Sequence, residues 1–251
     1  YCYKKKIIFL FTPHSETAID WAKKLKLPAI KIGSGELGNY RFLEKVILLK
    51  KPIIISTGMH TKKNLLDLKK FFVKKKYRKV IFLRCVTSYP TENNHLNLNN
   101  LATFRKIFNS AIIGYSDHTD SDLPIYFAVS NFAKVIEKHI ALDFNLKNAQ
   151  DWKVSHNETR LKNLIKNIRL LETIGGANFI NPSQKELKNK IWATKSLFYK
   201  TNLKKGQIIK ESMICAKRPG SGICCSEYPN FIGRKLKKNC KIGMIKRDDF
   251  F

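Results

Sequence analysis

The stretch that decides the fold runs from residue 112 to residue 142 and holds two apolar segments, IIGYSDHT (112–119) and KVIEKHIAL (134–142). Each segment reads as a buried β-strand that ends near a histidine, His118 in the first and His139 in the second. Parallel strands bring their carboxyl ends to one edge of a sheet, where α/β barrels collect functional side chains. Imidazole is a common ligand of divalent metal ions, so the pair indicates a metal-assisted reaction. From the spacing alone, two unrelated polar residues at strand ends would explain the pattern equally well.

Apolar β-branched segments and amphipathic segments alternate over the first two-thirds of the chain. Strands are expected at residues 6–12, 28–34, 52–58, 79–86, 111–118 and 134–142. Helices are expected at residues 15–27, 40–50, 61–75, 98–108, 121–133 and 158–174. This order predicts a parallel sheet covered on both faces and built from six strand–helix units, whereas a closed barrel has eight.

Polar and glycine residues gather after the expected strands, at their carboxyl ends. They are Thr12, Ser34, Gly35, Glu36, Ser56, Thr57, Gly58, Tyr89, Ser116, Asp117, His118 and His139. Active sites of parallel barrels and open α/β sheets lie at these ends, so we expect the functional site there.

After Gly176 the regular alternation of strand-like and helix-like segments ends. A polar connector that includes NPSQKELKNK is expected to link residues 1–176 to a small β-rich domain at residues 190–251, with the linker spanning 177–189. Within this tail, RPGSG (218–222) reads as a loop that holds Arg218 between turn residues.

The net charge of +29 raises the question of nucleic-acid binding. Only 9 of the 48 basic residues are arginines, and the lysines are scattered over almost every segment. We therefore expect no nucleic-acid partner, although a basic surface would attract an anionic substrate. No apolar run is long enough to cross a membrane, and the opening residues do not form a secretory signal. The six cysteines show no paired C-x-x-C spacing, so we expect reduced thiols and a cytoplasmic protein.

Seven strings together resemble the sialic acid synthase family, whose members condense phosphoenolpyruvate with the aldehyde of an N-acylated amino sugar. They are KIGSGELGNY (31–40), KPIIISTGM (51–59), SYPT (88–91), IIGYSDHT (112–119), VIEKHIALD (135–143), NLKKGQII (202–209) and KRPGSGI (217–223). The resemblance implies a (β/α)8 TIM-type barrel followed by a small antifreeze-like (SAF) domain. It also implies that the first two βα units of the family barrel are absent here, so that the sequence opens just before the third family strand.

The resemblance also assigns roles to residues. His118 and His139 match the two ligands of a divalent metal, manganese in most members, with magnesium as the alternative. Positions that hold phosphoenolpyruvate match Thr12, Lys31, Ser34, Ser56 and Ser116. Residues facing the sugar match Glu36, Tyr89 and Asp151, and Thr87 replaces a donor of the same strand end.

The tail is implied to cover the active site of a partner subunit in a domain-swapped homodimer. Arg218 would then contact the N-acyl group of the sugar, and Trp192 would help to cover the site. The expected product is N-acetylneuraminate, made from N-acetylmannosamine, or a related nonulosonate. The alternative is a truncated, non-catalytic fragment or one half of a split synthase, because the absent units carry a glutamate and a lysine of the family site.

Overall fold

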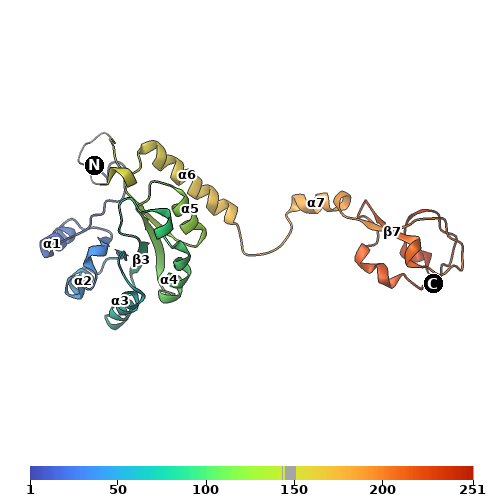
Figure 1. Ribbon diagram of the computed structural model, residues 1–251, viewed down its shortest axis with the longest axis horizontal. Coiled ribbons are helices and arrows are strands. Elements are labelled where there is room, and N and C mark those ends of the chain that lie inside the picture. The colour runs from blue at the N-terminus through green and yellow to red at the C-terminus, as the bar shows by residue number, and fades with distance from the viewer. Residues whose placement is uncertain (143, 145–150, 251) are drawn as a thin grey trace. The chain divides into compact units, whose positions relative to one another are not determined.

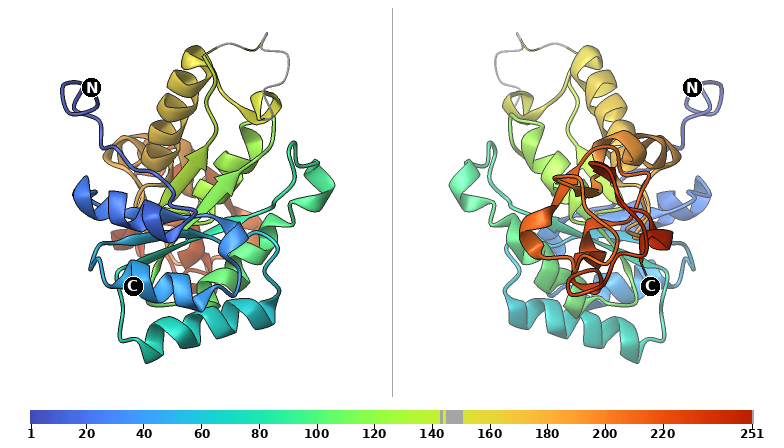
Figure 2. Two further views of the ribbon diagram at one scale, coloured as in Figure 1. Left: turned by 90° about the vertical axis from the view of Figure 1, so that its left-hand side faces the viewer. Right: turned by 90° about the vertical axis from the view of Figure 1, so that its right-hand side faces the viewer.

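The computed structural model describes residues 1–142, 144 and 151–250 and separates into two compact units, residues 1–176 and residues 177–251. The first unit is built on a parallel sheet of five strands in the order β1-β2-β3-β4-β5, which curls into part of a barrel (Figures 1 and 2). The strands are β1 (Ile30–Ile32), β2 (Ile53–Ser56), β3 (Val80–Cys85), β4 (Ile112–Asp117) and β5 (Val135–Lys138). Their spatial order equals their sequence order, as expected for successive strand–helix units.

One helix precedes β1, a helix follows each of the five strands, and together they cover the outer face of this sheet (Figure 1). They are α1 (Glu16–Lys24), α2 (Tyr40–Ile47), α3 (Lys62–Lys74), α4 (Leu101–Ile107), α5 (Leu123–Ser130) and α6 (Glu158–Gly175). Side-chain caps begin several of them: Ser15 accepts a hydrogen bond from the Ala18 amide, and Thr61 forms a capping box with Asn64. In the described parts of the chain, no helix is both long and apolar enough to cross a membrane.

The alternation of side chains along each strand separates the core from the site. One set faces the helices and forms the core with them; it includes Ile30, Ile32, Ile53, Ile55, Val80, Phe82, Ile113 and Tyr115. The other set faces the inside of the curl and carries Lys31, Ser56, Cys85, Ser116 and Glu137. The alternation of side chains along each strand therefore places these polar residues on one surface of the sheet.

The prediction of a strand at residues 6–12 was wrong, because these residues form no strand in the structure. Residues 7–12 make no ladder hydrogen bonds to β1, whose described sheet partner is β2 alone. Phe11 packs on the core, whereas Ile7 and Ile8 remain exposed. Apolar, β-branched composition indicates the preference for a strand, but a strand forms only where a neighbour pairs with the backbone.

The second unit holds an antiparallel sheet of three short strands in the order β7-β6-β8. These are β6 (Ser196–Tyr199), β7 (Ile214–Lys217) and β8 (Gly243–Met244), and they enclose a small core around Tyr199, Phe231 and Leu236. The second part of the expected linker lies in a helix, α7 (Gln184–Ala193), capped by Ser183 and Glu186 in a capping box. The S-x-x-E signal of Ser183 and Glu186 marks the start of this helix, whose residues advance only about 1.5 Å each along its axis.

Candidate active site

A lysine and a carboxylate meet inside the curl, at the carboxyl ends of the strands. The Lys31 Nζ on β1 lies 3.2 Å from Oε1 of Glu137 on β5, and the Ser56 hydroxyl on β2 donates to Oε2 of Glu137 at 3.2 Å. Ser116 is the register partner of Glu137, so its buried hydroxyl lies on the same inner face. The Lys31 ammonium and the Ser56 hydroxyl thus converge on one carboxylate, with the Ser116 hydroxyl on the same face, which is the chemistry of an anion-binding site.

Further hydroxyl groups and a backbone amide lie beside β1 and β2, next to this anion-binding site. The Gly58 amide donates to the Ser34 hydroxyl at 2.8 Å, so the loops after these two strands meet. A Cβ on Gly58 would lie 1.9 Å from Oγ1 of Thr87, a distance that no side chain permits. Glycine at position 58 therefore lets Ser34 and Thr87 approach the same backbone.

His118 is a neutral imidazole with one free ring nitrogen. Its ring is buried, and its Nδ1 lies 2.7 Å from the carbonyl oxygen of Val86. A carbonyl only accepts, so Nδ1 carries the proton and Nε2 keeps its lone pair. Burial lowers the pKa of His118, opposed by the Val86 carbonyl and reinforced by His139. The residue is therefore prepared to coordinate a cation rather than to carry a charge.

His139 follows β5 and comes close to His118, as the sequence predicted. The two ring centroids lie 5.2 Å apart, although 21 positions separate the residues in the chain. Oδ2 of Asp151 lies 3.5 Å from Nδ1 of His139, which directs that nitrogen toward the carboxylate and leaves Nε2 free. The Tyr89 ring contacts both imidazoles, with centroid distances of 4.1 Å to His118 and 5.8 Å to His139.

The environment of Tyr89 keeps its hydroxyl protonated. Partial burial, with smaller contributions from Cys85, Asp151 and Glu137, raises the pKa of Tyr89 to about 12. The phenol can therefore donate a hydrogen bond at neutral pH from a ring that lies against both imidazoles.

Two further predicted residues of the first unit, Glu36 and Thr12, are not joined to this cluster by any described contact. Glu36 accepts a hydrogen bond from the Asn39 side chain at 2.7 Å. Thr12 lies in the extended segment near Gly33. Arg218 and Trp192 belong to the second unit, where the guanidinium lies 5.9 Å from the Trp192 ring centroid and its Nε donates to the Ala193 carbonyl.

Two residues of the inner face were missed by the sequence prediction. Glu137 pairs with Lys31, and the Cys85 sulfur lies 3.8 Å from Nδ1 of His118. Burial raises the pKa of Cys85, so it is a neutral thiol against the histidine. Both could have been found from the alternation of side chains along a strand. Glu137 stands two residues before His139 and Cys85 two before Thr87, so each faces the same side of the sheet as a predicted residue.

The resemblance implies a divalent metal ion at these histidines. In the described residues, no group of three or more His, Cys, Asp or Glu side chains is arranged to hold an ion. The two imidazoles nevertheless offer free Nε2 atoms from adjacent strand ends. These two residues fit a divalent cation and would hold it through their Nε2 atoms.

Comparison with known proteins decides the family. The model of the NeuB family matches residues 1–179. The chain belongs to this family of sialic acid synthases. The N,N'-diacetyllegionaminic acid synthase of Campylobacter jejuni is 36% identical over 247 residues, which cover 98% of this chain and 73% of that protein. A pseudaminic acid synthase of the same species is 31% identical over 245 residues, which cover 97% of this chain and 71% of that protein.

A solved structure supports the same assignment for this NeuB-family chain. The N-acetylneuraminic acid synthetase of Leptospira borgpetersenii, crystallised with citrate, is 29% identical and superposes with a TM-score of 0.69. The match covers 74% of this chain and 65% of that one. The curled sheet of five parallel strands is therefore the arrangement of a sialic acid synthase barrel, and the chain is related to synthases of nine-carbon sugar acids.

Proposed function

We propose that this chain is a cytoplasmic synthase that condenses phosphoenolpyruvate with N-acetylmannosamine or a related N-acyl amino sugar. The product would be N-acetylneuraminate or a related nonulosonate. Family membership supports the reaction class, because the matched relatives are named as synthases of legionaminic, pseudaminic and N-acetylneuraminic acids.

One observation carries the proposal: the two imidazoles, whose Nε2 atoms have no partner among the described residues, lie at the same strand ends as the Lys31–Glu137 pair. His118 and His139 are 5.2 Å apart by ring centroid, and Lys31 points into the same curl toward Glu137. A cation beside an anion-binding site suits an enol phosphate reacting with a sugar carbonyl.

The anion-binding site would hold phosphoenolpyruvate. Lys31 supplies an ammonium, and Ser34, Ser56 and Ser116 supply hydroxyl donors from three different strand ends. An arriving phosphate or carboxylate would take the place of the Glu137 carboxylate beside Lys31. Thr12 and Thr87 extend the set of donors at the rim.

The proposed reaction forms one carbon–carbon bond and breaks one carbon–oxygen bond. The methylene carbon of phosphoenolpyruvate attacks the open-chain aldehyde carbon of the sugar, whose oxygen takes up a proton. Water then adds to the former enol carbon, and inorganic phosphate leaves with the bridging oxygen. The sum is phosphoenolpyruvate, aldehyde and water giving the 2-keto sugar acid and phosphate.

The side chains near the imidazoles would orient the sugar. A divalent cation held by His118 and His139, Mn²⁺ with Mg²⁺ as the alternative, would supply Lewis-acid polarisation of the aldehyde. Tyr89 remains a hydrogen-bond donor because its pKa is raised to about 12. Asp151 directs the His139 ring. Glu36 would accept a hydrogen bond from a hydroxyl group of the sugar.

The tail would complete the site from a partner subunit of a domain-swapped homodimer. The Trp192 ring and the Ala193 carbonyl hold the Arg218 guanidinium, which leaves N–H groups to donate to the N-acyl oxygen of the sugar. Trp192 is itself exposed and would cover the sugar.

The test compares metal binding and phosphate release in histidine variants. His118→Ala and His139→Ala should each weaken Mn²⁺ binding, measured by electron paramagnetic resonance, and abolish sugar-dependent phosphate release from phosphoenolpyruvate. His95→Ala changes an exposed histidine of the same unit and should do neither. Unchanged Mn²⁺ affinity in both site variants would overturn the proposed metal site.

A further inference from the structure

A buried ion pair lies directly behind the two site histidines, on the face of the sheet that packs against the helices. The Lys138 Nζ is 2.5 Å from Oδ2 of Asp117, and the two side chains are 4% and 0% exposed. Asp117 and Lys138 are register partners of β4 and β5, and each immediately precedes one of the histidines. The pair therefore joins the two strands one residue before His118 and His139.

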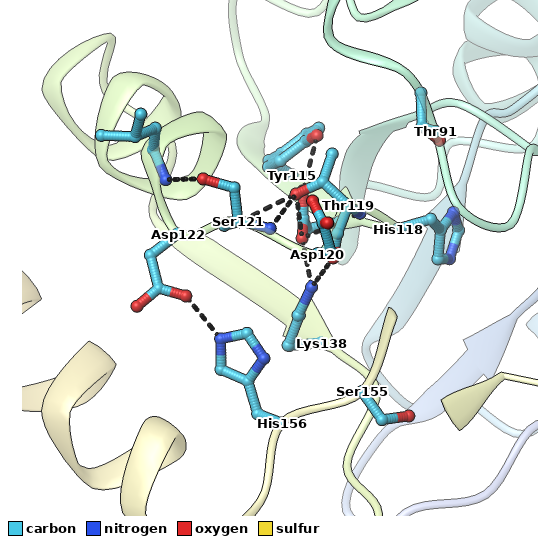
Figure 3. A network of polar contacts seen from close by, with 12 residues as sticks. Thr91, Tyr115, His118, Thr119, Asp120, Ser121, Asp122, Lys138, Ser155 and His156 are labelled. Carbon is cyan, nitrogen blue, oxygen red and sulfur yellow. Dashed lines mark hydrogen bonds and ion pairs between the residues drawn. The ribbon is translucent and has the colours of Figure 1, made fainter. Parts of the chain in front are cut away.

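The contacts of this pair enclose the backbone around His118 (Figure 3). Asp117 accepts hydrogen bonds from the Tyr115 hydroxyl at 2.9 Å and from the Thr119 amide at 3.2 Å. Lys138 also donates to the carbonyl of Thr119 at 2.5 Å. A single ammonium from β5 thus holds the residues on both sides of His118.

The peptide groups of the histidines are fixed as well. The carbonyl of His118 accepts from the Thr91 amide at 2.8 Å, and the carbonyl of His139 accepts from the His156 amide at 2.9 Å. Two side-chain contacts then join the segments at these strand ends. One is the Asp117–Lys138 pair, which links β4 and β5 themselves, and the other joins Nε2 of His156 to Oδ1 of Asp122 at 2.6 Å, in the segments that follow the two strands.

Stability alone gives little reason for this pair. Two charges in a buried layer lose their hydration, and a well-packed apolar pair of the same size is often as stable or more so. Tyr115, Ile125 and Ala128 are fully buried in the core cluster of this layer, and the buried polar residues Thr119 and His156 accompany the pair. An effect on the geometry of the two strand ends explains the Asp117–Lys138 pair better than stability does.

We propose that Asp117 and Lys138 are positioning residues that set the spacing and direction of the His118 and His139 imidazoles. The inference rests on the proposed function, because it gives that spacing a use in holding a divalent cation. Neither residue touches the cation or the substrate in this proposal. They act through the two backbones that carry the ligands.

The decisive variant is Asp117→Asn combined with Lys138→Met, which removes both charges and leaves neither unpaired. The matched control is Glu158→Gln combined with Lys162→Met, the same change in an exposed pair on α6. Asp117→Asn alone is a second variant, nearly identical in shape and still able to accept from Tyr115 and Thr119. Folding of every variant is checked by circular dichroism and thermal unfolding.

Two measurements on folded protein separate positioning from stability. Mn²⁺ affinity should fall about tenfold in the double variant and in Asp117→Asn, as for residues that orient metal ligands, and stay unchanged in the control. In metal-free protein labelled at histidine, the nuclear Overhauser effect between the two imidazoles should weaken in the same variants. Wild-type Mn²⁺ affinity together with an unchanged Overhauser effect in the folded double variant would overturn the proposal.

The design also separates this inference from the proposed function. If wild type and His118→Ala bind Mn²⁺ equally, the metal site is wrong, and the Overhauser effect alone decides whether the pair positions the rings. If His118→Ala weakens Mn²⁺ binding while the double variant matches wild type in both measurements, the metal site stands and the positioning role is rejected.

Discussion

Lys31 and Glu137 form an ion pair across the inside of the sheet, with Nζ 3.2 Å from Oε1, although they stand on its first and last strands. Neighbouring strands are about 4.8 Å apart, so β1 and β5 would be roughly 19 Å apart in a flat sheet. Such a separation exceeds the reach of the two side chains. The contact is therefore possible only because five strands already curl into part of a barrel.

This pairing predicts that Glu137 competes with anionic ligands. Glu137→Gln should strengthen the binding of phosphoenolpyruvate several-fold, because Lys31 and Ser56 lose a charged partner and the repulsion of an incoming anion disappears. Isothermal titration calorimetry measures the change. Glu172→Gln, which breaks the exposed pair with Arg169 on α6, should leave the affinity unchanged. Equal or weaker binding in Glu137→Gln would show that the carboxylate does not occupy the anion-binding site.

Gly114 is predicted to be required for the close approach of β4 and β5. A Cβ at this position would lie 2.2 Å from the Val135 carbonyl oxygen and 2.6 Å from the Leu83 side chain. Gly114→Ala should lower the free energy of unfolding by about 1–3 kcal/mol, as overpacking does, measured by chemical denaturation. The control is Gly35→Ala, where no atom lies within 4 Å of the added Cβ. If both variants were equally stable, β5 would have room to move.

The half-buried His60 predicts a loss of stability in mild acid. Burial lowers the pKa of His60, only partly opposed by the Gly58 carbonyl, so the native chain takes up this proton less readily than the unfolded chain. The free energy of unfolding should therefore fall as the pH drops below about 6.5, the ordinary histidine value. Denaturation at pH 7.5 and 5.5 should show a smaller fall in His60→Gln than in wild type. His95→Gln, at an exposed position, should keep the wild-type difference, and the same fall in His60→Gln would contradict the assignment.

Arg218 is predicted to act on the site of a partner subunit. Arg218→Ala and His139→Ala should each be nearly inactive, and co-refolding equal amounts should recover about a quarter of the wild-type sites. Half of the dimers are then mixed, and each mixed dimer has one intact site. Phosphate release from phosphoenolpyruvate measures the recovery, with each variant refolded alone as its control. No recovery on mixing would place Arg218 at its own barrel or outside the site.

Much of the barrel part and the meeting of the histidines could be predicted from the sequence, because both depend on local periodicity. Five of the six expected strands form, and His118 and His139 meet because parallel strand ends share an edge. The strand at residues 6–12 was not predictable in this way, since a strand needs a paired neighbour and composition does not reveal one. Helix α7 had a local signal in Ser183 and Glu186 that its polar composition concealed.

The charged residues next to the site were harder to predict, because their partners are far apart in sequence. Glu137 and Lys138 are adjacent, yet one faces Lys31 inside the curl and the other faces Asp117 behind the sheet. The opposite directions follow from the pleat, but the identity of each partner follows from register, which a single sequence does not display.

The same adjacency protects the strand against misalignment. A slip of β5 by one residue would turn Glu137 toward the buried carboxylate of Asp117 and Lys138 toward the ammonium of Lys31. Both faces would then bring like charges together, one of them out of reach of water. Electrostatic repulsion thus disfavours the shifted alignment on both faces of the sheet, so the charges beside the proposed site help to select the native strand pairing.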